Sequence, residues 1–298
     1  MASSTPHFGR VVTAMVTPFD GDGALDLDGA ARLAAHLADH GTDTVLVCGT
    51  TGEGPTVPEP EQLDLLRAVR DAVGHRARVL LGTGTNDTRT SCERSERATA
   101  AGADGLLVVT PYYNKPDQRG LLRHFRAVAG STDLPVILYD IPGRTGRQIA
   151  VDTLLELAEV DNIVAVKDAA LDLEKTALVA ARSPDGFQIY SGQDALNLPI
   201  LAVGGVGFIS VAAHIVGSEL ADMAASFDAD PVKAREIHLR LMPLFQALFL
   251  DPNPAPLKAI LNDLGLPAGP LRPPLATARD STLRALQDAL DLAGIPRR

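Results

Sequence analysis

A lysine at the end of an apolar run is the residue of this sequence best suited to covalent chemistry. Ile163–Val166 is typical of a strand buried on both faces, and Lys167 follows it directly. A buried ammonium group must be paired or lose its proton, and a neutral lysine amine can form a Schiff base with a carbonyl compound. The alternative is a lysine that caps the strand and points to solvent, as most such lysines do. Its neighbours must decide between these interpretations.

Residues after other apolar runs suit the binding of a small anion. Gly49–Gly54 is a tight loop that holds the hydroxyls of Thr50 and Thr51 and exposed backbone N–H groups, which fit a carboxylate. A glycine turn with helix-capping threonines has the same composition. Arg144 lies in a turn of proline and glycine, where it can bind a carboxylate in bidentate fashion or simply be solvated. Tyr113 follows another run.

The elements that must position these residues alternate along the chain. Eight strand-like runs are expected at 11–16, 44–48, 78–81, 105–109, 135–139, 162–166, 187–190 and 207–211. Between them, helices are expected at 28–40, 59–73, 88–101, 118–129, 151–159 and 173–181, among others. Eight β-then-α units predict a (β/α)8 barrel rather than a doubly wound sheet.

Strand signals stop after residue 230. Three helices are expected at 232–250, 256–264 and 280–292, separated by proline-rich pieces. The predicted organisation is therefore a barrel domain over residues 1–230 and a small three-helix domain over residues 231–298.

Composition excludes several classes of function. The formal charge of −10, without a basic cluster, argues against a nucleic-acid surface. No apolar run approaches the length of a membrane span, and Met1–His7 has no apolar stretch of signal-peptide length. Cys48 and Cys92 show neither metal-ligand nor disulfide spacing, so we expect a cytoplasmic protein with reduced thiols and no metal site.

The barrel brings the candidate residues together. Active sites of such barrels lie at the carboxyl ends of the strands, which is where the hydroxyls, Arg144 and Lys167 all stand in this sequence. Their convergence on one barrel mouth favours a reactive lysine over a solvated one.

An ordered set of motifs resembles one enzyme family. The motifs are Gly-Thr-Thr-Gly-Glu at 49–53, Pro-Tyr-Tyr-Asn at 111–114, Tyr-Asp-Ile-Pro-Gly-Arg-Thr-Gly at 139–146, Val-Lys-Asp at 166–168, Ser-Gly at 191–192 and Gly-Gly-Val-Gly-Phe-Ile-Ser at 204–210. In this order they resemble the dihydrodipicolinate synthase / N-acetylneuraminate lyase family of class I aldolases. The resemblance covers nearly the whole chain, and the segment 251–258 also resembles the synthase branch.

The resemblance implies a role for each site residue. Lys167 would form an imine with pyruvate, whose carboxylate would lie on Thr50 and Thr51. Tyr139 would be the general acid/base, linked through Thr50 to Tyr113 in a proton relay. The remaining implied residues are Arg144, for the carboxylate of L-aspartate 4-semialdehyde, and Gly192 and the Ile209 carbonyl, which would line the pyruvate pocket.

The same resemblance implies partners and alternatives. Pyruvate and the semialdehyde would condense toward lysine and diaminopimelate without a cofactor, since pyruvate is itself bound covalently as a substrate. A homotetramer built from two dimers is implied, because the Tyr113 equivalent reaches a neighbouring subunit's site. Another pyruvate-dependent aldolase of the family, such as an N-acetylneuraminate lyase or a 2-keto-3-deoxy sugar acid aldolase, is the main alternative, and those branches usually lack the equivalent of Arg144. A non-catalytic keto-acid-binding protein is a further one.

Some positions depart from the family pattern. Asp140 replaces a common asparagine and Gln193 a frequent aspartate, and Asp168 stands where many members have glutamate. None of these changes removes a group that the imine needs. Members inhibited by lysine carry histidines and a glutamate around an interface cleft. The matching positions here are Glu59, Gln62 and Thr90, although Asn86 and Tyr112 are retained.

We therefore expect weak or absent inhibition by L-lysine, because the groups that would hold it are replaced. Assays at saturating pyruvate with millimolar L-lysine should retain most of the activity. Complete loss of activity under these conditions would contradict the prediction.

Overall fold

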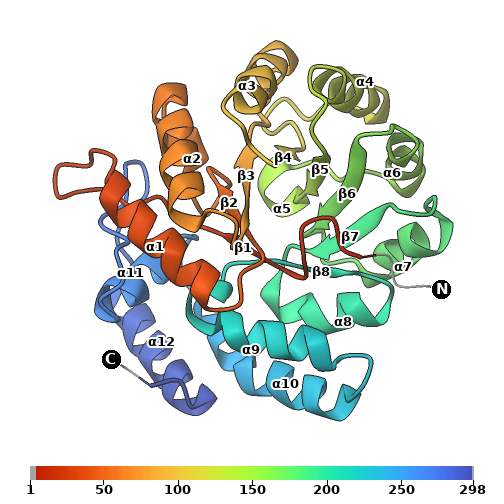
Figure 1. Ribbon diagram of the computed structural model, residues 1–298. Coiled ribbons are helices and arrows are strands. Elements are labelled where there is room, and N and C mark those ends of the chain that lie inside the picture. The colour runs from red at the N-terminus through yellow and green to blue at the C-terminus, as the bar shows by residue number, and fades with distance from the viewer. Residues whose placement is uncertain (1–4, 297–298) are drawn as a thin grey trace. The chain divides into compact units, whose positions relative to one another are not determined.

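The computed structural model describes residues 5–296 of the 298-residue chain. Its eight strands have the order of a closed parallel barrel in which each strand neighbours the next in sequence (Figure 1). This confirms the (β/α)8 class expected from the alternating pattern. Met1–Ser4, part of the stretch expected to lack a signal peptide, lie outside the described residues.

The strands lie where the apolar runs predicted them, with bounds that differ by at most two residues. The fifth and sixth strands continue through Asp140 and Asp168, because these residues still pair with each other across the sheet. The strands are β1 (Val11–Ala14), β2 (Thr44–Val47), β3 (Arg78–Gly82), β4 (Gly105–Val109), β5 (Val136–Asp140), β6 (Ile163–Asp168), β7 (Gln188–Ser191) and β8 (Gly207–Ser210).

The helices named from the sequence are also present. They are α1 (Leu27–Asp39), α2 (Glu59–Val73), α3 (Thr88–Ala100), α4 (Gln118–Ala129), α6 (Val151–Ala158), α7 (Leu173–Arg182), α10 (Pro231–Ala247), α11 (Ala255–Asp263) and α12 (Asp280–Ala293). Helices that the sequence analysis did not name are η1 (Gly54–Thr56), α5 (Pro142–Thr145), η2 (Asp194–Leu196), α8 (Asn197–Ala202) and α9 (Ala213–Ser226). Among residues 5–296, no helix combines the length and the apolar character that a membrane crossing requires.

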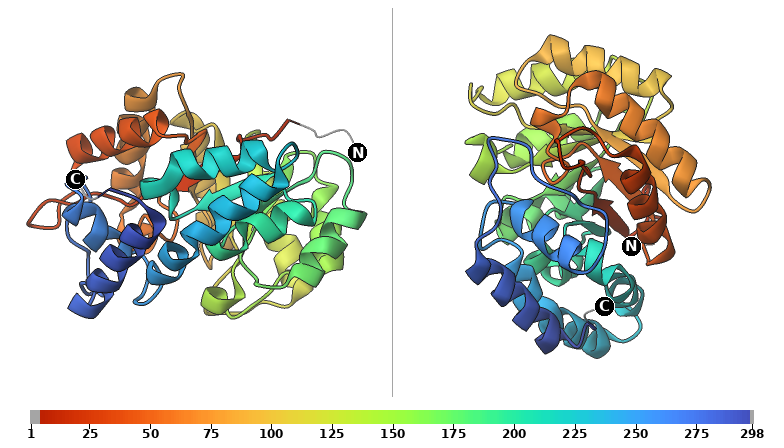
Figure 2. Two further views of the ribbon diagram at one scale, coloured as in Figure 1. Left: turned by 90° about the horizontal axis from the view of Figure 1, so that it is seen from below. Right: turned by 90° about the vertical axis from the view of Figure 1, so that its left-hand side faces the viewer.

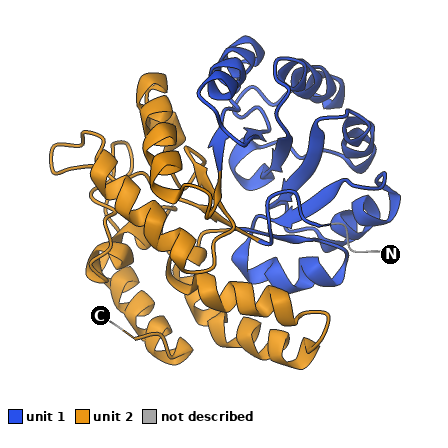
Figure 3. Cartoon of the chain, in the orientation of Figure 1, with its two compact units in different colours: residues 1–10, 79–209 blue, residues 11–78, 210–298 orange. Residues whose placement is uncertain are grey.

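The chain divides into two compact units (Figure 3). Unit 1 comprises residues 1–10 and 79–209, and unit 2 comprises residues 11–78 and 210–298. In unit 2, β1 pairs with β2, α1 packs on α2, and α10 lies beside both α9 and α12 (Figure 2). The three expected C-terminal helices are α10, α11 and α12, whereas a domain boundary at residue 230 remains a prediction.

Aspartate side chains begin several of these helices. Asp87, Asp117 and Asp172 accept hydrogen bonds from backbone N–H groups of the first turns of α3, α4 and α7 in unit 1. Asp26 and Asp230 do the same for α1 and α10 in unit 2. Each cap satisfies a donor that the helix itself leaves unpaired, and so fixes where the helix starts after the preceding strand or loop.

In unit 1 the register of β5 and β6 decides which side chains can meet. Tyr139 is paired with Lys167, and Asp140 with Asp168. Successive side chains of a strand point to opposite faces, so each pair shares one face. Both aspartates contact side chains of α7. Tyr139 and Lys167 therefore lie on the face turned away from that helix.

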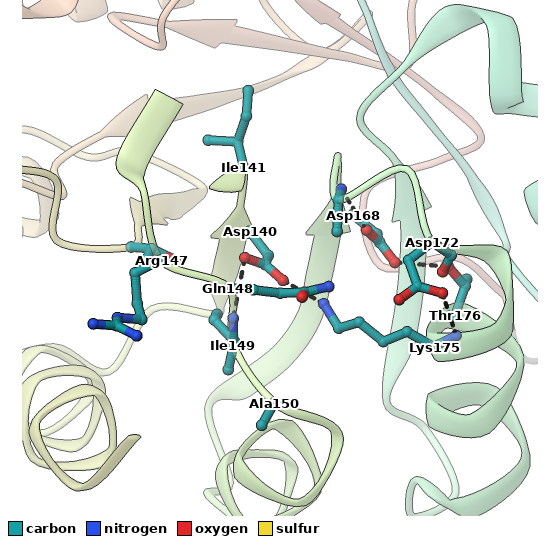
Figure 4. A network of polar contacts seen from close by, with 12 residues as sticks. Asp140, Ile141, Arg147, Gln148, Ile149, Ala150, Asp168, Asp172, Lys175 and Thr176 are labelled. Atoms are coloured by element: carbon teal, nitrogen blue, oxygen red, sulfur yellow. Dashed lines mark hydrogen bonds and ion pairs between the residues drawn. The ribbon is translucent and has the colours of Figure 1, made fainter. Parts of the chain in front are cut away.

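The face toward α7 holds a buried ion pair. The Lys175 ammonium contacts Asp140 Oδ2, and both side chains are almost fully buried (Figure 4). The N–H of Ile149 donates to the other oxygen of Asp140 at 3.2 Å. Burial raises the pKa of Asp140, and the Lys175 ammonium opposes that rise. The pair ties the end of β5 to the first turn of α7.

Replacing Lys175 with methionine should lower the free energy of unfolding by about 3–5 kcal/mol, because it leaves a buried carboxylate without its cation. Urea unfolding followed by circular dichroism measures the loss. The double variant Asp140→Asn/Lys175→Met keeps an acceptor for Ile149 and removes the charge, so it should be more stable than Lys175→Met alone.

A matched control comes from Lys233, which forms an ion pair with Asp222 in which each side chain is 47% exposed. Lys233→Met should cost at most about 1 kcal/mol, since exposed pairs are screened by water. Equal losses in Lys175→Met and Lys233→Met would contradict a stabilising role for the buried pair.

Candidate active site

Lys167 is buried near the end of β6, with 4% of its surface exposed. Its Nζ lies 4.2 Å from the centroid of the Tyr139 ring, which projects from the neighbouring strand β5. Among residues 5–296, the Lys167 ammonium forms no ion pair, since no carboxylate oxygen lies within 4.0 Å of it. The solvent-pointing alternative for Lys167 is therefore wrong.

Burial lowers the pKa of Lys167 to about 7, because the low-polarity surroundings disfavour the charged form. The positive charge of Arg144 lowers it further, and the carboxylate of Asp194 opposes the shift. An amine with this pKa is neutral in a large fraction of molecules near neutral pH. It can then attack a carbonyl carbon, which a protonated lysine cannot do.

Gly192 leaves room for the stem of Lys167. A Cβ at position 192 would lie 3.0 Å from Lys167 Cγ and 3.0 Å from the Cβ of Ala169. The N–H of Gly192 donates to the Asp168 carbonyl at 2.7 Å, which holds the backbone in this place. Any larger residue would press on the lysine.

Ile209 stands close to the same strand ends. It follows Phe208 in β8, which is paired with Ser191 in β7, so Ile209 and Gly192 each come one residue after a paired position. The Ile209 side chain is buried. The register places the backbones of both predicted pocket residues at the same level of the sheet.

Arg144 lies in α5, a single turn directly after β5 that the sequence analysis described only as a rigid turn. Pro142 begins the turn, and Gly146 ends it at φ 69°, a left-handed conformation that favours glycine. The Thr145 hydroxyl donates to the Ile141 carbonyl at 3.1 Å and holds the turn against the strand. The Arg144 side chain is exposed and available to a ligand.

Tyr113 is placed differently from the other predicted residues of unit 1. Its side chain is 89% exposed, and its backbone has a φ of 72°. Such a ring contacts little of its own chain, so the structure does not bring Tyr113 to the Lys167–Tyr139 pair. The left-handed backbone is costly for a tyrosine and must be held by the surrounding loop.

Thr50 and Thr51 lie in unit 2, on the loop between β2 and η1. Thr51 is buried and Thr50 half-buried. The loop depends on its glycines, because a Cβ at Gly54 would lie 2.3 Å from the Cys48 carbonyl oxygen and one at Gly52 2.9 Å from the Cys48 nitrogen. The loop can therefore take only a narrow range of sequences.

Glu53 fixes this loop through contacts of its carboxylate with Lys258 and Arg272. It is a left-handed residue (φ 53°) whose carboxylate is buried against the Lys258 ammonium, with Oε1 and Nζ 2.6 Å apart. The N–H of Arg272 donates to its Oε2 at 2.9 Å. The Lys258 ammonium and the Arg272 guanidinium both lie over the ring of Phe19, at 4.4 Å and 4.1 Å from its centroid. Helix α11 and the segment that follows it thus hold the threonine loop in shape.

The structure brings Lys167, Tyr139 and Gly192 together in unit 1 and sets Arg144 within electrostatic reach. Thr50 and Thr51 form the loop of unit 2, and the catalytic role of each residue remains a prediction. Residue types and spacing did not predict the contributions of Asn253, Lys258 and Asp194. For Asn253 and Lys258 the available signal was a pair of polar residues among the prolines of segment 251–258. Among residues 5–296, no group of three or more His, Cys, Asp or Glu side chains could hold a metal ion.

The chain is similar to a known protein family and to several of its members. The sequence profile of the dihydrodipicolinate synthetase family matches residues 7–293. The 4-hydroxy-tetrahydrodipicolinate synthase of Moorella thermoacetica is 52% identical over 290 residues, which cover 97% of this chain and 99% of the relative.

Crystal structures of related proteins are similar over nearly the whole chain. DHDPS from Cyanidioschyzon merolae with lysine bound superposes with a TM-score of 0.95 at 45% identity, covering 97% of this chain and 99% of that one. Dihydrodipicolinate synthase from Acinetobacter baumannii, complexed with pyruvate, gives a TM-score of 0.93 at 34% identity, covering 96% and 99%.

The low pKa of Lys167 predicts its reactivity profile. The rate of acetylation by trace acetic anhydride, followed by peptide mass spectrometry, should rise through pH of about 7 and level off at a pH well below that at which Nα-acetyl-lysine levels off. Arg144→Met should move the profile to higher pH and Asp194→Asn to lower pH, since one change removes a cation and the other an anion. A pH profile of Lys167 that coincides with that of Nα-acetyl-lysine would contradict the prediction.

Proposed function

We infer the function from the family, since the chain belongs to the dihydrodipicolinate synthetase family. We propose that it condenses pyruvate with L-aspartate 4-semialdehyde to 4-hydroxy-tetrahydrodipicolinate. It would thus be a lyase of lysine and diaminopimelate biosynthesis. The observation that carries the proposal is a buried amine with a pKa of about 7 that faces a tyrosine, in a chain 52% identical to a synthase of that name.

The reaction begins at Lys167. Its neutral amine attacks the keto carbon of pyruvate, and loss of water gives an imine that takes up a proton. The protonated imine draws electrons, so the pyruvate methyl group loses a proton and an enamine forms. The enamine carbon then bonds to the aldehyde carbon of the semialdehyde, and the new alkoxide takes up a proton. Tyr139, beside the amine, is the proposed acid/base for these transfers.

The remaining residues bind and orient the substrates in this scheme. Thr50 and Thr51 hold the pyruvate carboxylate, and Gly192 and the Ile209 carbonyl line its pocket. Arg144, exposed on a turn that is itself fixed, binds the semialdehyde carboxylate. Tyr113 completes the proton relay through Thr50. The imine is the only electron sink that the scheme requires, so we propose that no metal or organic cofactor takes part.

The assembly that we propose is a homotetramer of two dimers, working in the cytoplasm on these small molecules and without nucleic acid or membrane partners. The exposed ring of Tyr113 supports it, because a relay residue that lies away from its own site can serve the site of a neighbouring subunit.

The alternatives differ in the second substrate or in turnover. An N-acetylneuraminate lyase or a sugar acid aldolase would accept a hydroxylated aldehyde and has less use for Arg144. A keto-acid-binding protein needs no acid/base group, whereas this chain places Tyr139 directly over the amine. The observed geometry therefore favours an enzyme.

A coupled assay with pyruvate and each candidate aldehyde tests the proposal. Aspartate semialdehyde should be consumed and sugar-derived aldehydes should not. Borohydride with pyruvate should leave a covalent adduct on Lys167, and Lys167→Arg, which keeps the charge, should leave none. Consumption of a sugar-derived aldehyde instead, or an adduct on another lysine, would overturn the assignment.

Arg144 gives the sharpest test of the second substrate. Arg144→Met should lower kcat/KM for the semialdehyde about 100-fold, because it removes the cation that pairs with the substrate carboxylate, while the pyruvate adduct still forms. An unchanged kcat/KM would remove Arg144 from the proposed site.

A further inference from the structure

A buried hydrogen bond joins the C-terminal region of unit 2 to the threonine loop. Asn253 Nδ2 donates to Thr51 Oγ1 at 3.0 Å, and the two residues are 6% and 3% exposed. Asn253 lies just before α11, far from Thr51 in the sequence. The contact is therefore tertiary, and it reaches a residue that the proposed reaction uses.

The direction of this bond constrains the hydroxyl of Thr51. A hydroxyl has one hydrogen to donate and can accept through its lone pairs. When the Asn253 amide donates to it, the hydrogen of Thr51 must point elsewhere. Among residues 5–296, the Thr51 hydroxyl accepts this hydrogen bond and donates none. The hydrogen is thus left for a ligand, and an anionic acceptor such as a carboxylate is the strongest partner for it.

The segment that carries Asn253 is fixed on both sides. On one side, Asp251 accepts hydrogen bonds from Thr282 at 2.6 Å and from Arg279 at 2.8 Å. On the other side, Lys258 is paired with Glu53 at the end of the same threonine loop. The loop is therefore held at two points by one segment, so the amide cannot follow the hydroxyl if that rotates.

We propose that Asn253 is a positioning residue that turns the Thr51 hydroxyl into a dedicated donor to the substrate carboxylate. This inference rests on the proposed function, in which Thr51 binds pyruvate. Asn253 acts through Thr51 and does not touch the substrate.

A double-mutant cycle tests the inference in the full-length chain. The variants are Asn253→Ala in three backgrounds, namely wild type, Thr51→Val, which lacks the hydroxyl, and Thr51→Ser, which keeps it. The readouts are the pyruvate concentration that half-saturates borohydride trapping at Lys167, and KM and kcat measured separately. Thermal melting verifies that each variant is folded.

Asn253→Ala should raise the half-saturating pyruvate concentration about tenfold in the wild-type and Thr51→Ser backgrounds, the effect of weakening a hydrogen bond to a charged group. In the Thr51→Val background it should change that concentration less than about twofold. The effect should fall on KM for pyruvate more than on kcat. Equal effects in the Thr51→Val and Thr51→Ser backgrounds would show a merely structural role and overturn the inference.

Asn253→Asp serves as a second variant of nearly identical shape, also where Asn253→Ala is too unstable to measure. A carboxylate can only accept from Thr51, so it should capture the hydrogen and weaken pyruvate trapping at least as much as alanine does, with a smaller loss in the Thr51→Val background. Wild-type trapping by Asn253→Asp would overturn the inference while leaving the proposed function intact. Absence of a pyruvate adduct in the wild-type protein would overturn the proposed function and the inference with it.

Discussion

Removing an ammonium group from water without a close counter-ion is the energetic cost on which the site depends. Three lysines of this chain are buried, and two of them are neutralised by a carboxylate, Lys175 by Asp140 and Lys258 by Glu53. Lys167 has the face of Tyr139 and the more distant charge of Asp194 instead. Its proton is therefore held weakly, so burial leaves a larger fraction of the molecules with a neutral, nucleophilic amine near neutral pH.

The two paired lysines support the chemistry without taking part in it. The Asp140–Lys175 pair lies on the opposite face of β5 from Tyr139 and ties that strand to α7. The Glu53–Lys258 pair holds a left-handed residue of the threonine loop in unit 2. Buried ion pairs of this kind add little net stability, but losing one partner is costly. They make the local geometry intolerant of change, and positioned catalysis requires such rigidity.

Much of the fold could be predicted because its signals are local. Apolar runs mark the strands, helical spacing of apolar residues marks the helices, and the alternation of the two predicts the barrel that the strand order confirms. Lys167 could be singled out for the same reason, since it interrupts an apolar strand. The bond from Asn253 to Thr51 could not, because it joins residues about two hundred positions apart through a side-chain orientation that no periodicity encodes. Nor could the sequence tell that Lys175 and Lys258 are buried as deeply as Lys167, since their carboxylate partners lie far away in the chain.

Lysine is scarce in this protein, and that scarcity affects how the charge of the whole protein varies with pH. Only five of the 27 basic residues are lysines, and of these only Lys115 and Lys233 are exposed. The other basic residues are arginines, whose guanidinium groups stay charged throughout the range in which proteins function. The positive charge that lysine and arginine give the surface is therefore almost constant from neutral to mildly alkaline solution. A rise of pH from neutral to mildly alkaline therefore alters the reactive amine, whereas the net charge of the protein, which is −10 at pH 7, stays nearly the same.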